Sequence, residues 1–93
     1  MKAIELIKEK LEAIELKYSK PLNHSGSTTL SDTKERLLKL TPILKSFNDE
    51  ATNAINEMIT EGVIELTEEL RGEIKQQSNY SVRRITRAVT GMQ

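Results

Sequence analysis

The sequence contains no cysteine, which excludes disulfide bonds and thiolate metal sites. A zinc site around its single histidine, His24, would need carboxylates for the remaining ligands, an unusual ligand set. Only Tyr18, Phe47 and Tyr80 are aromatic, so the core has to be built from aliphatic side chains. An aliphatic core combined with many glutamates and lysines is typical of helical proteins.

Long apolar runs are also missing. No segment approaches the roughly 20 apolar residues that a membrane-spanning helix needs. Charged residues interrupt the amino terminus too early for the apolar region of a signal peptide. We therefore expect a cytoplasmic protein without a membrane partner. The length of 93 residues predicts one domain with a small core.

Motifs that carry catalytic chemistry are absent as well. There is no glycine-rich phosphate loop, metal-ligand cluster or nucleophile elbow. His24 and Ser25 lie in a polar segment without a nearby acidic residue to orient the histidine, and Glu57 and Glu61 share a helical face without a histidine partner. We predict no enzymatic activity, catalytic residue, cofactor or metal.

The charges are unevenly distributed along a chain whose net charge is zero. Residues 71–93 contain five basic residues and one acidic residue, a net charge of +4, so residues 1–70 carry −4. A localised phosphate-binding surface would produce this asymmetry. Two oppositely charged faces of a self-associating protein would produce it too.

The first predicted helix covers residues 1–18. Its apolar residues alternate in steps of three and four, the spacing of a heptad seam: Ile4, Ile7, Leu11, Ile14 and Tyr18. This seam packs either on the core of its own domain or against a second copy in a dimer. Residues 19–30 are small or polar and contain Pro21 and Gly26, which predicts a flexible loop.

Residues 31–62 are predicted to form the central helices. Asp32 and Glu35 have the spacing of a capping box and begin a short helix that ends near Leu40. Thr41 and Pro42 are typical of a second helix start, so the long central helix is predicted over residues 42–61, with Gly62 as its cap and Phe47 as the largest core residue. Residues 63–66 are expected to be an extended connector.

Residues 66–91 are predicted to form two short helices around a turn at residues 75–79. Thr67 is the expected cap of the first helix, and Gly72 within it indicates a close helix crossing. In the second helix, Val82, Ile85 and Val89 recur at helical spacing and are expected to face the core. The residues expected to project outward are Ser81, Arg83, Arg84, Thr86 and Arg87.

This predicted pair resembles the helix-turn-helix of bacterial repressors, in which the second helix enters the major groove of DNA. The matching positions are Leu70, Ile74, Tyr80, Ser81, Ile85, Ala88 and Val89. The sequence departs from the family pattern at Lys75, where a small residue is usual, and at Asn79, where glycine is usual.

We thus predict an all-α fold of four to five helices with a long central helix and a C-terminal helix-turn-helix-like pair. The resemblance implies a small regulatory protein that binds duplex DNA through Asn79, Tyr80, Ser81, Arg83, Arg84, Thr86 and Arg87. It also implies a homodimer or a higher homo-oligomer, with the seam of the first helix as its contact. One alternative is a helical protein-protein interaction module, of the kind found among phage inhibitors and adaptors, that acts by self-association and partner occlusion. The other is a helical oligomer that binds a small anionic ligand.

Overall fold

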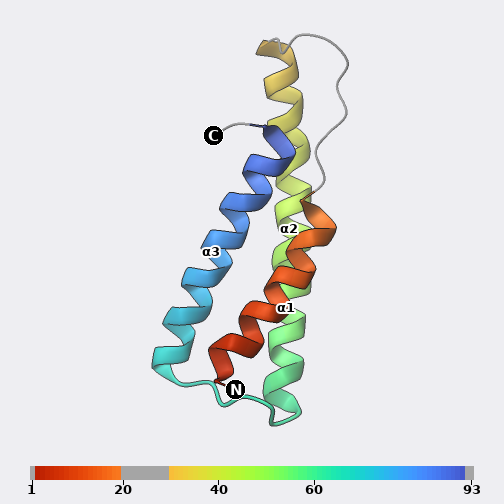
Figure 1. The fold of residues 1–93 in the computed structure, drawn as a ribbon. Coiled ribbons are helices and arrows are strands. Elements are labelled where there is room, and N and C mark those ends of the chain that lie inside the picture. The colour runs from red at the N-terminus through yellow and green to blue at the C-terminus, as the bar shows by residue number, and fades with distance from the viewer. Residues whose placement is uncertain (1, 20–29, 92–93) are drawn as a thin grey trace.

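The computed structural model describes residues 2–19 and 30–91. Three helices follow one another in these residues: α1 (Ala3–Tyr18), α2 (Leu30–Thr60) and α3 (Glu68–Thr90). Helix α2 runs antiparallel to the other two, and each helix packs against both others (Figure 1). The bundle is elongated, with extents of 49 × 20 × 18 Å. The predicted all-helical class is confirmed, whereas the predicted number of four to five helices is wrong.

The two helices predicted within residues 31–62 form the single helix α2, which passes through Pro42. Proline inside a helix costs about 3 kcal/mol, because it lacks an N–H donor and crowds the preceding turn. The apolar face nevertheless continues on both sides of it, with Leu40 and Phe47 both buried, while Pro42 itself is exposed. Burial of this face offsets the local cost. The side chain of Asp32, and residues 20–29 of the predicted loop, lie outside the described part of the chain.

Helix α3 replaces the predicted helix-turn-helix-like pair, which is therefore a wrong description of residues 66–91. The expected turn, residues 75–79, contains neither glycine nor proline, and its lysine and glutamines favour helix. No described residue other than glycine has a positive φ, so Asn79 does not adopt a left-handed turn. One side of α3 is buried from Leu70 to Val89, which keeps the helix continuous.

The predicted helix ends are confirmed where glycine or a cap defines them. Thr67 precedes α3, and its Oγ1 accepts a hydrogen bond of 3.1 Å from the Leu70 amide. Gly62 follows α2 with a φ of 75°, a left-handed conformation that only glycine adopts without strain. The connector between α2 and α3 is held to the core by Ile64, which is buried.

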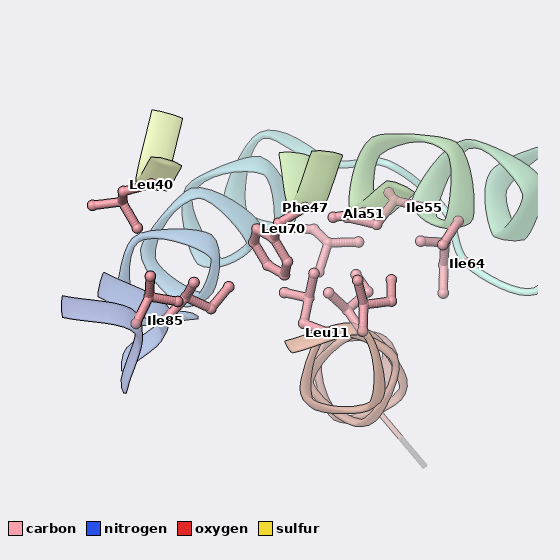
Figure 2. Close-up of a cluster of buried hydrophobic side chains, with 12 residues drawn as sticks. Leu11, Leu40, Phe47, Ala51, Ile55, Ile64, Leu70 and Ile85 are labelled. Atoms are coloured by element: carbon pink, nitrogen blue, oxygen red, sulfur yellow. The ribbon is translucent and has the colours of Figure 1, made fainter. Parts of the chain in front are cut away.

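The core lies where the three helices meet, and Phe47 is its largest fully buried side chain, as predicted (Figure 2). The other buried hydrophobic residues are Ile7, Leu11, Ile14, Leu40, Ala51, Ala54, Ile55, Ile64, Leu70, Ile85 and Val89. The close crossing predicted at Gly72 is wrong, because a Cβ atom added there would meet nothing within 4 Å. No helix in the described ranges is long and apolar enough to cross a membrane.

Candidate interaction surface

The structure divides the residues predicted to bind DNA into two groups. Asn79, Tyr80, Arg83 and Arg87 are exposed on the outer side of α3. Ser81 was expected to project outward, but it is only 1% exposed, so this prediction is wrong. Arg84 and Thr86 instead form side-chain contacts within the chain.

Arg84 is tied to α1 by Glu15. Its guanidinium donates hydrogen bonds from Nε to both carboxylate oxygens at 3.0 Å and from Nη2 to one of them at 2.9 Å. This two-pronged contact further raises the pKa of Arg84, mainly through the hydrogen bonds to Glu15. The Thr86 hydroxyl is also engaged, since it donates to the Val82 carbonyl at 2.7 Å. The ion pair makes Arg84 a link between α1 and α3.

The side chains of Arg83 and Arg87 form no hydrogen bond or ion pair with any other residue of the described chain. They lie one helical turn apart on α3, so their Cβ atoms are separated by about 6 Å. Their guanidinium groups are therefore available to an anionic partner. Arg83 and Arg87 are the predicted cationic residues that the structure leaves free for binding.

The seam predicted as a dimer contact faces the core of its own chain. Ile7, Leu11 and Ile14 are 0%, 1% and 4% exposed, and Ile4 and Tyr18 are half-buried against the same cluster. Of the two packing arrangements expected for this seam, the structure has the intramolecular one. A contact with a second copy therefore has to use another surface.

An ordered row of polar side chains follows the outer side of α3. We call it the α3 stripe and define it by Glu69, Glu73, Gln76, Tyr80, Arg83 and Arg87. Successive members are four, three, four, three and four residues apart, so they stay on one side of the helix. All are exposed except Glu73, which is half-buried. The stripe is acidic at the N-terminal end of α3 and basic at the C-terminal end.

The acidic half of this stripe is absent from the site predicted from the sequence. The predicted turn at residues 75–79 puts Glu69 and Glu73 in a different helix from Arg83 and Arg87, and it places Gln76 in the turn itself. The signal was nevertheless present, since the heptad spacing runs without interruption through residues 75–79. Reading this segment as one helix reveals the stripe.

The burial of Ser81 leads to a prediction about the stability of the protein. Its hydroxyl is enclosed by the core and has no hydrogen-bond partner among the described residues. We predict that Ser81→Ala raises the free energy of unfolding by about 1 kcal/mol, because it removes an unsatisfied hydroxyl and because alanine favours helix. Urea denaturation should show the gain, while Ser46→Ala at an exposed position of α2 leaves stability within about 0.5 kcal/mol. Lower stability of Ser81→Ala would show that the hydroxyl is hydrogen-bonded in solution.

A second polar cluster joins α1 to α2. The Glu50 carboxylate accepts hydrogen bonds from Lys17 Nζ at 2.5 Å and from the Tyr18 hydroxyl at 2.8 Å. These contacts lower the pKa of Glu50, with Lys17 as the largest cause, and the hydrogen bond to Glu50 raises the pKa of both Lys17 and Tyr18. The cluster stands at one end of a shallow groove lined by Lys10, Ala13, Ile14, Lys17, Glu50, Asn53, Ala54 and Glu57.

The lowered pKa of Glu50 predicts a pH dependence of stability. A carboxyl group whose pKa is lower in the folded state contributes stability above its unfolded pKa of about 4.3, and that contribution is lost as the pH falls through the folded value. We expect native protein to exceed Glu50→Gln in free energy of unfolding at neutral pH, and the difference to shrink on acidification below about pH 4. Urea denaturation across this range measures it, and a difference independent of pH would contradict the prediction.

The comparisons with known proteins provide no relative from which a function could be carried over. Searches of protein-family models, of curated proteins and of solved structures find no match to this chain.

Proposed function

We propose that this chain is a helical protein-protein interaction module that works by self-association through the outer side of α3. The observation that carries the proposal is the α3 stripe, whose acidic and basic halves are separated along one helix. Opposite charges placed apart on one surface attract each other between two copies. The module is thus complementary to itself.

The charge distribution over the rest of the bundle supports this proposal. Around the connection between α2 and α3, residues 57–73 contain six acidic residues and Arg71, a net charge of −5. At the opposite end of the bundle, residues 34–45 contain four basic residues and Glu35, a net charge of +3 (Figure 1). Because the two ends of the bundle carry opposite charges, two copies attract each other in an orientation that brings unlike ends together.

The proposed contact is mainly polar, because four of the six stripe residues are charged and a fifth is Gln76, whereas the buried hydrophobic side chains of the three helices meet in the core (Figure 2). Exposed ion pairs are each worth about 0.2–1 kcal/mol and weaken as salt screens them. We therefore expect reversible association that is strongest at low ionic strength.

Sedimentation velocity over a concentration series tests the proposal. At about 0.01 M salt, where the screening length is about 30 Å, the apparent mass should rise with concentration above the 10.5 kDa of one chain. At about 1 M salt it should return to the mass of one chain. A single chain at every concentration and salt level would refute self-association.

Duplex DNA is a second candidate partner, favoured by the free guanidinium groups of Arg83 and Arg87. In this proposal the arginines contact phosphates, and a continuous α3 lies along the duplex. Fluorescence anisotropy with a mixed-sequence duplex should show binding that falls with salt and is lost in the double variant Arg83→Ala, Arg87→Ala. The control Lys39→Ala, Lys45→Ala removes two exposed cations of α2. Absence of binding at low salt would eliminate DNA as the partner.

A further inference from the structure

We propose that a second copy of this chain docks on the α3 stripe in antiparallel orientation, with the two-fold axis crossing the stripe between Gln76 and Tyr80, level with Ser78 along the helix. The inference rests on the proposed function and names the partner, the orientation and the register. A second helix could pack on an exposed helix side in several orientations. The arrangement of charges on the stripe favours the antiparallel one.

The register follows from the positions of the charged residues. In an antiparallel helix pair centred beside Ser78, each residue faces the one equally far from Ser78 on the other side. Glu69 then faces Arg87 of the second copy, and Glu73 faces Arg83 of the second copy. By symmetry both contacts occur twice, so every charge of the stripe meets an opposite charge.

The parallel orientation lacks this complementarity. With the two helices in register and parallel, Glu69 and Glu73 would meet their own copies, and so would Arg83 and Arg87. Like charges placed opposite each other are destabilising. A parallel pair shifted far enough to match the charges would lose most of the contact length, since the acidic and basic halves are more than two helical turns apart.

The heptad spacing lets the contact continue along the helix. A repeat of 3.5 residues keeps a seam facing a partner helix when the two helices wind gently around each other. From Glu69 to Arg87 the stripe is about 27 Å long at the usual rise per residue. Two α3 helices are therefore in contact over most of their length.

At the centre of the stripe, Gln76 and Tyr80 provide hydrogen-bonding groups, and the Tyr80 ring also provides apolar surface. Gln76 donates to the Tyr80 hydroxyl at 3.0 Å within the chain, which leaves the tyrosine proton and the glutamine carbonyl oxygen free. In the proposed register Tyr80 faces Gln76 of the second copy, where these two groups match. Tyr80 is also one of the exposed large hydrophobic side chains, at 39%, and tyrosine is enriched at protein interfaces.

The stripe charges have no competing contacts within the chain. Within the described structure, the side chains of Glu69, Glu73, Arg83 and Arg87 form no hydrogen bond or ion pair. By contrast the neighbouring Arg84 is held by Glu15. These four side chains can therefore pair with a second copy without breaking any hydrogen bond or ion pair within the chain.

Charge reversal tests the pairing. One variant carries Arg83→Glu and Arg87→Glu, and the other carries Glu69→Arg and Glu73→Arg. By sedimentation velocity at low salt, each alone should associate at least about tenfold more weakly than native protein, and an equimolar mixture should recover the loss. Circular dichroism of each variant checks that the helices remain folded. The control Lys8→Glu, Lys10→Glu reverses two exposed lysines of α1, outside the stripe and outside both charged ends of the bundle, and should leave association unchanged. Association that the stripe variants do not weaken would overturn the inference.

Distances between spin labels test the orientation without disturbing the charged pairs. Because the chain has no cysteine, Asn79→Cys places a single label near the proposed axis. In the antiparallel pair these labels are offset by only about 3 Å along the helix. Labels at Thr67→Cys, just before α3, are offset by about 33 Å. Short distances at both Thr67 and Asn79 would indicate a parallel pair and overturn the inference while leaving self-association intact. Absence of any dimer at low salt would overturn both.

Discussion

Replacing Phe47 by alanine is expected to lower the free energy of unfolding by about 4 kcal/mol. Phe47 is 0% exposed and lies among buried side chains of all three helices (Figure 2). Its removal loses the burial of a whole ring and leaves a cavity that helices fixed on three sides fill only in part. No other residue concentrates so much core volume in one side chain.

Urea denaturation followed by far-ultraviolet circular dichroism measures this effect. Because domains of this size are stable by only about 5–15 kcal/mol, the variant should show a large fall in its unfolding midpoint. Leu38→Ala serves as the matched control, since Leu38 is 74% exposed on the same helix and should change stability by less than about 0.5 kcal/mol. A similar loss in both variants would contradict the placement of Phe47 at the centre of the core.

The parts of the fold that could be predicted from the sequence are those in which local and long-range signals agree. The seam of α1 repeats without interruption, so its helix and its buried side follow from spacing alone. Thr67 marks the start of α3 because its hydroxyl caps the helix, and Gly62 marks the end of α2 because glycine adopts a left-handed conformation. No neighbouring residue favours continuing either helix. Phe47 could be identified as a core residue because it is the only phenylalanine and lies on the apolar side of α2.

The errors arose where a local signal opposed the packing of the whole chain. Thr41 and Pro42 look like a helix start, yet α2 continues through them because its apolar side is buried before and after. Whether burial outweighs a proline depends on partners from other helices, which a single segment does not reveal.

The predicted and observed buried sides of α3 differ for a related reason. In the short second helix predicted from the sequence, Val82, Ile85 and Val89 alone define the buried side. In the continuous helix the buried side begins at Leu70, and residues eleven positions apart lie on nearly the same side, which places Ser81 over the core. The same error hid the acidic half of the α3 stripe. Both corrections follow once residues 68–90 are read as one helix.

Substituting Pro42 by alanine is expected to raise the free energy of unfolding by about 2 kcal/mol. Alanine is about 3 kcal/mol more favourable than proline inside a helix. Part of that gain, about 0.4–1 kcal/mol, is offset because proline restricts the unfolded chain. Pro42 is exposed within α2, so its ring contributes little to the core. The substitution therefore removes a local cost without removing packing.

Urea denaturation of Pro42→Ala beside Lys45→Ala separates this effect from a general preference of the helix for alanine. Lys45 is exposed one turn further along α2, and its substitution should change stability by less than about 0.5 kcal/mol. Hydrogen exchange adds a local measurement, because alanine restores the amide that proline lacks, and this amide should be protected if α2 is continuous. A less stable Pro42→Ala would mean that the backbone geometry imposed by proline is what places Leu40 in the core. In that case the proline would stabilise the fold through packing, although it weakens the helix locally.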